Sequence, residues 1–365
     1  MTLAIASLFI TGLYTLLILR FKQGWKKISE FQPDITTDTV NTRVSVIIAF
    51  KNESKNLPTL LETFKKQTYR KFEAIFIDDH STDNSFNLIE QDLAQNPGFR
   101  LFKATGSGKK AAIAQAVALS RHDFIITTDA DCSAGSRWLE TIAAYFEQNN
   151  PDLIIGPVTI KSNNTFFGKL QQIEFVSLVA AGAGAAGTGM PVMCNGANLA
   201  YKKKVWFESK KDLHEHELSG DDIFLLHSIK NRKGKINFLK SAYALVSTQA
   251  APDIKSFFRQ RSRWAGKSPS YTDFETIVTA LIVLGISLVQ LLLLCCLPFK
   301  PEFYGILWLV IFFLKLAIDL SLLKQTNQLF KIKSITIYSL LIAIVYPFYI
   351  IVAATKGFIG SRKWK

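Results

Sequence analysis

The chain has 365 residues, 48% of them hydrophobic, which suits one large domain together with membrane helices better than two ordinary soluble domains. Its formal net charge of +14 fits attraction to anionic membrane lipids, and no nucleic-acid-binding motif accompanies the charge, which argues against a nucleic-acid partner. The four cysteines form no metal-ligand pattern.

The first predicted element is an uncharged hydrophobic segment over residues 2–19. Its length is close to the ~20 residues that cross a bilayer core, and four basic residues follow it between positions 20 and 27. No positive leader precedes the segment and no small-residue cleavage signature ends it, so we expect an uncleaved anchor over residues 1–20 rather than a signal peptide. Because basic residues accumulate on the cytoplasmic side of membrane segments, we expect the following domain in the cytoplasm.

Residues 44–160 alternate apolar runs with helical patterns. The predicted strands are Val44–Ala49, Ala74–Ile77, Phe99–Lys103, Phe124–Thr128 and Leu153–Val158. The predicted helices between them include one over Ala111–Leu119 and one that Ser136 caps. Repeated βα units of this length predict an α/β fold with a doubly wound, Rossmann-like sheet. Ligands in such sheets bind beyond the carboxyl ends of the strands.

Carboxylates follow two of these predicted strands at the edge where ligands bind. Asp79 comes after the second strand, and Asp129 and Asp131 follow the fourth. Carboxylate oxygens are the ligands that Mg²⁺ and Mn²⁺ prefer, and these ions share their coordination shell with phosphate. The alternatives are an Asx-type turn around Asp79 and a solvated turn that caps the next helix at Asp129. Their position at the strand ends favours a binding role.

Two glycine-containing segments are weaker signals. Lys109 lies in the loop Gly106-Ser-Gly-Lys-Lys110, which is not a phosphate loop of the GxxxxGK[ST] type, and it is a candidate phosphate contact or simply an exposed lysine. An apolar, helix-like stretch from residue 166 to 190 ends in Gly182–Gly187, which matches the dinucleotide fingerprint GxGxxG. The fingerprint requires a preceding strand, and here a predicted helix precedes it and Pro191 follows, so we expect a flexible or closely packed glycine loop.

Two motifs follow farther along the chain. Asp221 and Asp222 open a predicted helix, where acids also interact favourably with the helix dipole. Gln260, Arg263 and Trp264 are spaced i, i+3 and i+4, so they share one face of a helix. Such a face offers an amide, a phosphate-binding guanidinium and an aromatic platform for a sugar ring. Apolar residues beside them make the stretch amphipathic and suited to a membrane interface.

Three more hydrophobic segments, at 275–298, 303–323 and 335–355, predict a C-terminal transmembrane region over residues 275–355. Three lysines between the last two segments agree with a cytoplasmic central domain. Four crossings would leave the basic tail outside, so either a segment lies flat or re-enters, or the tail is an exception. Lys315 and Asp319, one helical turn apart, can pair, line a polar path or lie near the cytoplasmic end of their segment.

In their order, four motifs resemble those of inverting family 2 glycosyltransferases of the membrane-bound synthase type. These motifs are IDDHSTDNS with Asp79, Asp129-Ala-Asp131, GDDIFLL with Asp222, and Gln260-x-x-Arg263-Trp264. That family includes cellulose, chitin, hyaluronan and poly-N-acetylglucosamine synthases and ceramide glucosyltransferases. The resemblance covers about residues 44–267, and the flanking hydrophobic segments fit the general plan of the family but no particular member.

The resemblance implies a GT-A nucleotide-sugar domain over residues 42–267, with an interfacial helix around 253–267, in a multi-pass protein of the inner cell membrane. It implies that Asp222 is the general base that deprotonates the acceptor. Asp79, Lys109, Asp129 and Asp131 would then bind the donor, a UDP-sugar, with Mg²⁺ or Mn²⁺ held by Asp129 and Asp131. The remaining implied residues would bind the acceptor: Asp221, Gln260, Arg263 and Trp264. A less specific match, Cys194–Asn198, resembles the segment that lines the acceptor side.

The sequence leaves two alternatives for the acceptor, a membrane lipid and a growing glycan. Four predicted segments are few for a polysaccharide channel, which slightly favours the lipid, although an oligomer or an export partner can complete a channel. A transport or sensor protein with a non-catalytic nucleotide-sugar-like domain is an alternative from another class. That alternative predicts no turnover and no effect of Asp222→Asn, and the intact acids argue against it. A hydrolase with paired carboxylates is a further alternative, and it would need neither nucleotide nor metal.

Overall fold

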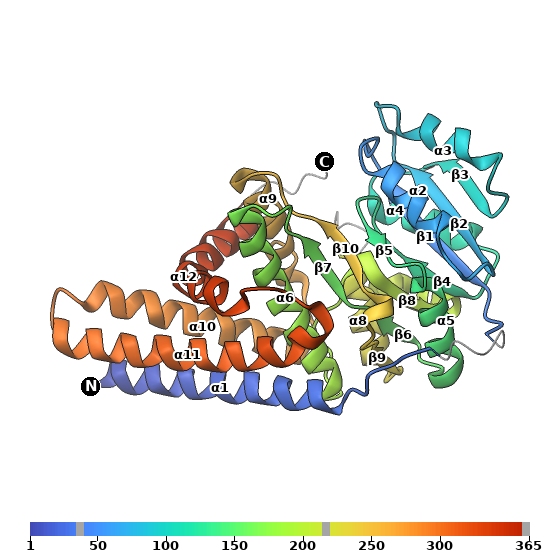
Figure 1. Ribbon diagram of the computed structural model, residues 1–365. Helices are drawn as coiled ribbons and strands as arrows, with labels where there is room; N and C mark the ends of the chain where they lie inside the picture. Colours follow the sequence, from blue (N-terminus) through green and yellow to red (C-terminus); the bar gives the residue numbers. More distant parts are fainter. Residues whose placement is uncertain (34–39, 214–219, 360–365) are drawn as a thin grey trace. The chain divides into compact units, whose positions relative to one another are not determined.

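The structure is a computed structural model, and it describes residues 1–33, 40–213 and 220–359. The chain divides into two compact units (Figure 1). Among the described residues, unit 1 is formed by residues 1–28, 162–192 and 250–359, and unit 2 by residues 29–33, 40–161, 193–213 and 220–249. The tail beyond residue 359, whose basic residues bear on the orientation of the last segment, lies outside the described residues.

Unit 2 is built on a mixed sheet of seven strands in the order β3-β2-β1-β4-β8-β6-β9. These strands are β1 (Val44–Phe50), β2 (Phe72–Asp78), β3 (Phe99–Lys103), β4 (Phe124–Thr127), β6 (Leu153–Ile155), β8 (Leu199–Lys202) and β9 (Ile236–Phe238). The helices of the unit are α2 (Leu57–Lys65), α3 (Ser85–Leu93), α4 (Lys109–Leu119), α5 (Trp138–Asn149), α7 (Lys203–Ser209) and α8 (Asp221–Asn231). This arrangement confirms the predicted Rossmann-like α/β fold.

The first four strands of the sheet are parallel to one another, and β8 runs antiparallel to both β4 and β6. Parallel strands form here because their side chains are apolar on both faces. Val46 and Ile48 of β1 and Ile75 and Ile77 of β2 are all 0% exposed. From β1 the chain steps outward to β2 and β3, and β4 then pairs on the other side of β1, so the strand order reverses between β1 and β4. Ligands bind at such reversal points in open α/β sheets.

Two sequence predictions in this unit are wrong in detail. The predicted strand Leu153–Val158 is two strands, because Gly156-Pro157 separates β6 from β7 (Val158–Lys161). β7 belongs to a second sheet of three strands, β5-β10-β7, with β5 at Ser133–Ala134 and β10 at Val246–Gln249. The predicted cap at Ser136 is also wrong, because α5 begins after Arg137 and has no side-chain cap.

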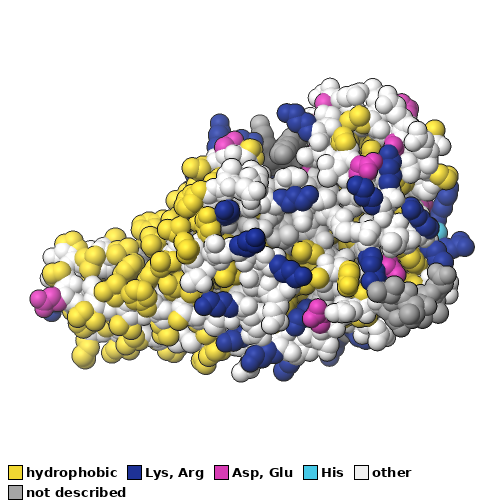
Figure 2. Space-filling view, in the orientation of Figure 1, with side chains coloured by type: hydrophobic (Ala, Val, Ile, Leu, Met, Phe, Trp, Pro, Cys, Tyr) yellow, Lys and Arg dark blue, Asp and Glu magenta, His cyan; other side chains and the backbone are white. Residues whose placement is uncertain are grey.

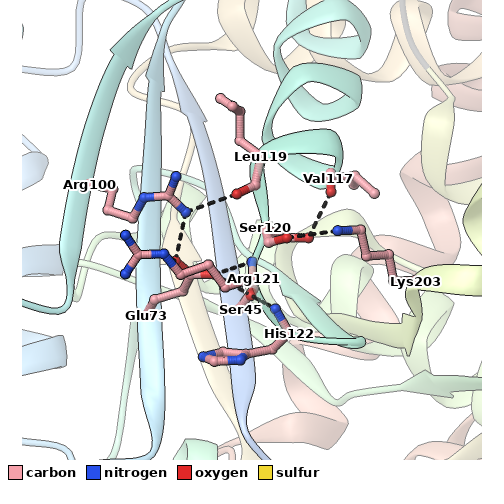
Figure 3. Close-up of polar contacts among 9 residues, drawn as sticks. All are labelled: Ser45, Glu73, Arg100, Val117, Leu119, Ser120, Arg121, His122 and Lys203. Carbon is pink, nitrogen blue, oxygen red and sulfur yellow. Dashed lines mark hydrogen bonds and ion pairs between the residues drawn. The ribbon is translucent and has the colours of Figure 1, made fainter.

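A polar cluster occupies the amino ends of the parallel strands (Figure 3). Its centre is Glu73, 4% exposed at the start of β2. The Oε1 atom of Glu73 accepts hydrogen bonds from Ser45 Oγ at 2.7 Å and from the backbone N of Arg121 at 2.6 Å. The Oε2 atom pairs with Nη1 of Arg100 at 2.8 Å, and the same nitrogen donates to the Leu119 carbonyl. The cluster therefore ties β1, β2 and β3 to the end of α4.

Unit 1 is helical in its described parts. Its helices are α1 (Thr2–Lys27), α6 (Phe166–Gly187), α9 (Ile254–Ala265), α10 (Phe274–Cys296), α11 (Pro301–Phe330) and α12 (Ile335–Ile359). Four of them, α1, α10, α11 and α12, are long and apolar enough to cross a membrane, and they coincide with the predicted segments. Hydrophobic side chains gather over the long helices of this unit on the face drawn in Figure 2. α1, α10 and α11 contact one another, and α12 contacts α6 and α9.

The glycine-rich segment Gly182–Gly187 is not a loop but the end of α6, so that part of its prediction is wrong. The alternative of close packing is confirmed, since α6 lies against α1 along small residues. A Cβ atom on Gly184 would lie 2.4 Å from the Phe21 carbonyl oxygen, and one on Gly187 would lie 2.1 Å from the carbonyl oxygen of Gly24. Glycines allow this approach because they have no side chain to separate the two backbones.

The charged residues Lys315 and Asp319 of α11 pair with each other. Lys315 is 5% exposed, and its Nζ lies 2.6 Å from Oδ2 of Asp319. The hydroxyl of Tyr14 on α1 donates to the other oxygen of Asp319 at 2.7 Å, and the Lys315 ammonium lies over the ring of Tyr14 and over that of Tyr346 on α12. The pair therefore joins three of the apolar helices, and its charges are compensated inside the helix bundle.

Candidate active site

Asp79 follows β2 directly and is 1% exposed. Its backbone N donates to the Phe50 carbonyl at the end of β1, and its Oδ1 accepts the backbone N–H of Gly108 at 2.9 Å. Gly108 has φ +93°, a backbone conformation that suits glycine, and it precedes the first residue of α4. The second oxygen, Oδ2, is buried without a hydrogen-bond partner among the described residues. A buried carboxylate oxygen is costly to leave unpaired, so a ligand donor is expected there.

The neighbouring acid, Asp78, has a different environment. Its Oδ1 accepts the backbone N–H of Ser81 at 3.0 Å, which closes the turn after β2. Asp78 therefore serves the Asx-type turn that was the alternative for this segment, whereas Oδ2 of Asp79 has no hydrogen-bond partner in the part of the chain that the structure describes.

Lys109 is the first residue of α4, and its ammonium forms an ion pair with Oδ1 of Asp129. Burial lowers the pKa of Lys109, but the nearby charges of Asp129, Asp221 and Asp222 outweigh burial and raise that pKa above its ordinary value. Lys109 therefore stays a cation, and it lies near carboxylates that come from two separate parts of the sequence. The structure thereby brings the acids after β4 and the acids of α8 to one place within unit 2.

Asp131 lies two residues beyond Asp129, and a residue of the second sheet holds its side chain. Its Oδ2 accepts a hydrogen bond from Thr248 Oγ1 of β10 at 3.0 Å. Burial and the negative charge of Asp129 raise the pKa of Asp131 to about 6, although the bond from Thr248 and the charge of Lys109 act in the opposite direction. Two carboxylates that repel each other in this way are suited to a bound cation.

The ligand atoms of Asp129, Asp131 and Cys132 lie within 4.8 Å of one another, so these three side chains can hold a metal ion. The two carboxylates provide the oxygen ligands that Mg²⁺ and Mn²⁺ prefer. Burial and the charge of Asp131 raise the pKa of the Cys132 thiol well above its ordinary value in the metal-free protein. Sulfur is a soft ligand, and hard cations such as Mg²⁺ prefer the carboxylate oxygens. The residues present therefore fit a hard divalent cation held by Asp129 and Asp131.

Asp221 and Asp222 form the first turn of α8, after Gly220 in the left-handed conformation at φ +99°. The Oδ2 of Asp222 accepts the backbone N–H of Gly196 at 3.1 Å, and its Oδ1 accepts that of Ile223 at 2.8 Å. The carbonyl of Gly196 in turn accepts a hydrogen bond from Thr127 Oγ1 at the end of β4. The peptide of Gly196 therefore links the strand that carries Asp129 to the carboxylate of Asp222.

Gln260, Arg263 and Trp264 lie on α9 and belong to unit 1. α9 begins after Asp253, whose side chain caps it by accepting the backbone N–H of Ser256 at 2.7 Å. Arg263 is exposed, and Gln260 and Trp264 are partly buried. The buried arginine of this helix is instead Arg261, which pairs with Glu174 of α6.

Comparison with known proteins identifies part of the chain. The family model described as glycosyl transferase family 2 matches residues 45–206. The match covers less than half of the chain and makes residues 45–206 similar to a glycosyl transferase family 2 domain. The matched region holds β2 to β4, Asp79, Lys109 and the pair Asp129 and Asp131. The segment from 221 to 264, with the other predicted site residues, lies outside the match.

Among relatives, the chain is 29% identical over 154 residues to poly-beta-1,6-N-acetyl-D-glucosamine synthase of Staphylococcus aureus strain COL, covering 40% of this chain and 36% of that protein. It is 28% identical over 114 residues to glycosyltransferase GlyG of Streptococcus pneumoniae serotype 4, covering 31% of this chain and 38% of that protein. Little more than a third of each relative is therefore matched.

Among solved structures, the chain is similar to the mannosyltransferase PcManGT from Pyrobaculum calidifontis in complex with GDP-Man and Mn²⁺. The TM-score is 0.58, the identity is 16%, and the match covers 98% of this chain and 99% of that one. At this identity the likeness concerns the fold. The fold of this chain is GT-A, with an N-terminal helix and three C-terminal apolar helices that could span a membrane.

Three residues outside the predicted set also hold site residues in position. Thr248 holds Asp131, and Gly196, itself held by Thr127, holds Asp222. Of these three residues, the sequence indicated only Gly196, through the weak match over Cys194–Asn198. In that segment Asn198 has a structural role, because its buried amide bonds to Trp138 and to the carbonyls of Pro157 and Ala244.

Proposed function

We propose that the chain is a membrane-anchored inverting glycosyltransferase that transfers a sugar from a UDP-sugar to a membrane lipid or a growing glycan. The observation that carries the proposal is the group of Asp129, Lys109, Asp221 and Asp222 beyond the carboxyl ends of the strands, beside the buried and unpaired oxygen of Asp79. The proposal includes an anchor over residues 1–20, a cytoplasmic catalytic domain over residues 42–267 and a transmembrane region over residues 275–355 of an inner-membrane protein.

On the donor side, Asp79 is proposed to accept a hydrogen bond from the base or ribose of the nucleotide through Oδ2. Lys109 is the cation for the diphosphate, since its ammonium stays charged beside Asp129. Asp129 and Asp131 would hold Mg²⁺ or Mn²⁺, and a divalent cation there neutralises charge that develops on the leaving diphosphate. Transfer then depends on both nucleotide and metal, which a hydrolase with paired carboxylates would not require.

On the acceptor side, Asp222 is proposed to be the general base. Its oxygens accept hydrogen bonds from two backbone N–H groups, which orient the carboxylate. The acceptor hydroxyl gives its proton to Asp222 as its oxygen bonds to the anomeric carbon, and the bond from that carbon to the diphosphate oxygen breaks. Asp221, Gln260, Arg263 and Trp264 are proposed to bind the acceptor.

The test is sugar incorporation by membranes that contain the full chain, supplied with labelled UDP-sugars and Mg²⁺ or Mn²⁺. UDP-N-acetylglucosamine comes first because one relative is named as a poly-beta-1,6-N-acetyl-D-glucosamine synthase. GDP-mannose is included because the structural neighbour was solved with GDP-Man. Asp222→Asn should abolish incorporation, and Asp123→Asn, the same change at an exposed acid of unit 2, should not.

The product identifies the acceptor. Label that enters the organic phase and disappears in Asp222→Asn identifies a lipid glycosyltransferase, and high-mass label identifies a polysaccharide synthase. Incorporation only from GDP-mannose would reject the UDP-sugar as donor. Incorporation that survives in Asp222→Asn would reject Asp222 as the base. The absence of transfer with every donor, together with normal folding, would reject the enzymatic proposal in favour of a transport or sensor role.

A further inference from the structure

Three helices of unit 1 meet at a buried ion pair. Arg261 of α9 and Glu174 of α6 are 4% and 3% exposed. The guanidinium donates through Nε to Oε1 of Glu174 at 3.1 Å and through Nη2 to Oε2, so the two groups form a two-point contact. The hydroxyl of Tyr349 on α12, one of the apolar helices, donates to Oε1 of Glu174 at 2.6 Å. The carboxylate therefore joins α9 to α6 and α12.

Arg261 also contacts residues of its own helix. Its guanidinium carbon lies 4.2 Å from the ring centroid of Trp264 and 4.6 Å from that of Phe257. Its Nη1 donates to the side-chain oxygen of Gln260 at 2.6 Å. Trp264 also packs against Phe175, the neighbour of Glu174 on α6. One buried side chain thus contacts both Gln260 and Trp264.

The ion pair does more than hold the helices together. Removing a guanidinium and a carboxylate from water is costly, and apolar residues of similar size would pack the same helices at least as well. A two-point contact between planar groups fixes direction, which apolar packing does not. The contact between Arg261 and Glu174 therefore sets the rotation of α9 about its axis and the orientation of the Trp264 ring on the face of the guanidinium.

We propose that Arg261 is a positioning residue, held by Glu174 and Tyr349, which fixes the side chains of Gln260 and Trp264 for the acceptor. This inference rests on the proposed function, because the acceptor role of Gln260 and Trp264 belongs to it. Arg261 does not touch the substrate. It acts through the two residues that it contacts, and the carboxylate that orients it comes from a part of the chain 87 residues away.

The test uses the full chain in lipid nanodiscs, with Arg261→Gln and Glu174→Gln compared with Arg259→Gln. Arg259 is exposed on the same helix, so its replacement removes the same charge without breaking the buried contact. Two quantities are measured: amide hydrogen exchange over residues 254–265, and the KM values for acceptor and donor. Arg261→Gln and Glu174→Gln should speed the exchange and reduce kcat/KM for the acceptor by about a hundredfold, as misplacement of a binding group does, with the donor KM unchanged. Arg259→Gln should change neither quantity.

Milder variants keep the test informative if these two fold poorly. Arg261→Lys keeps the charge but loses the two-point contact and the planar stacking on Trp264, so it should impair the acceptor KM more than Tyr349→Phe does. An equal change of both KM values, or unchanged exchange and acceptor KM in Arg261→Gln and Glu174→Gln, would overturn the positioning role. Faster exchange over 254–265 without turnover by the wild type would support the fixing of α9 by this ion pair and count against the proposed function, so the two failures are distinguishable.

Discussion

Buried carboxylates at the two edges of the large sheet have opposite environments. At the amino edge Glu73 receives donors on both oxygens, from Ser45, Arg121 and Arg100 (Figure 3). Burial acts to raise the pKa of Glu73, but these hydrogen bonds and the charge of Arg100 more than offset it, so the pKa lies below its ordinary value. At the carboxyl edge one oxygen of Asp79 has no hydrogen-bond partner among the described residues, and the pKa of Asp131 is raised to about 6.

The difference distinguishes carboxylates that stabilise the fold from carboxylates that are suited to bind a ligand or a cation. A buried carboxylate whose donors are all protein groups stabilises the fold, because its charge is compensated before any ligand arrives. A buried carboxylate that lacks donors, or that faces another carboxylate, costs stability and gains partners only from a ligand or a cation. Substitutions of these carboxylates at the carboxyl edge should therefore reduce activity and spare the fold, and substitution of Glu73 at the amino edge should do the reverse.

The largest effect is expected for Asp131→Asn. Loss of one of the two carboxylates that would hold the divalent cation should reduce transfer by about 10³-fold, because such a cation is worth several kcal/mol to the transition state. In the metal-free protein the same change should increase the free energy of unfolding at pH 7. A carboxyl whose folded pKa is raised binds its proton more tightly in the folded state, so stability falls as pH rises from the unfolded value of about 4 to the folded value of about 6.

Transfer assays with titrated Mn²⁺ and denaturant unfolding in a chelator measure the two parts of this prediction. The gain in unfolding free energy is expected to be about 1–3 kcal/mol for a shift of this size. Loss of both stability and activity in Asp131→Asn would contradict the distinction between the carboxylates of the two edges.

Glu73→Gln should have the opposite profile. Breaking a buried ion pair from one side leaves the Arg100 guanidinium without its carboxylate, which should reduce the free energy of unfolding by about 3 kcal/mol. Transfer per folded molecule should stay at the wild-type level. Because the pKa of Glu73 is lowered, its contribution is present above the unfolded pKa and is lost as pH falls through the folded pKa, so the two proteins should converge in stability in acid. Denaturant titrations between neutral and acidic pH provide the measurement.

Asp79→Asn tests the unpaired oxygen directly. The amide nitrogen that replaces one carboxylate oxygen cannot accept a hydrogen bond, so affinity for the nucleotide should fall by about tenfold, the worth of one hydrogen bond to a charged group. Calorimetric titration with UDP measures this loss. Asp78→Asn is the matched control, because Asp78 closes the turn after β2 and should not affect nucleotide affinity. Equal losses in the two variants would show that the turn, and not the oxygen of Asp79, is responsible.

The position of the acids beyond the carboxyl ends of β2 and β4 could be predicted from the sequence for a physical reason. Each parallel strand is a continuous apolar run, so its end is visible in the sequence, and the acids that follow β2 and β4 were placed beyond the sheet on that ground alone. The glycine-rich end of α6 was predicted as a loop because glycine favours loops, but its packing against α1 outweighs that preference. The break at Gly156-Pro157 was hidden inside one apolar run.

The long-range contacts of Asp222 and Arg261 could not be predicted from the sequence. Asp222 is held by a backbone N–H 26 residues away, and Arg261 by a carboxylate 87 residues away. Local periodicity carries no signal for either contact, since each depends on how separate elements pack. The motif spacing indicated Arg263, and only the structure shows that Arg261 is buried on the same helix while Arg263 is exposed.

The smallest effect is expected for Thr127→Val, which tests whether the carboxyl edge of β4 positions Asp222. Valine keeps the shape of threonine but removes the hydroxyl that donates to the Gly196 carbonyl at 2.9 Å. The Gly196 peptide then loses one of the contacts that hold its N–H on Asp222, and kcat should fall about fivefold, near the net worth of one neutral hydrogen bond. Thr127→Ser, which keeps the hydroxyl, should restore most of the rate.

Thr141→Val is the control for this change. Thr141 is 0% exposed and also donates to a backbone carbonyl, that of Arg137, but within α5. Both valine variants should lose a similar free energy of unfolding, since each removes one buried hydrogen bond, and only Thr127→Val should slow transfer by the folded protein. A rate loss shared by both variants would mean that general loosening of unit 2 slows the reaction. A loss confined to Thr127→Val would extend the binding edge of the sheet from the acids themselves to the strand end that holds them in place.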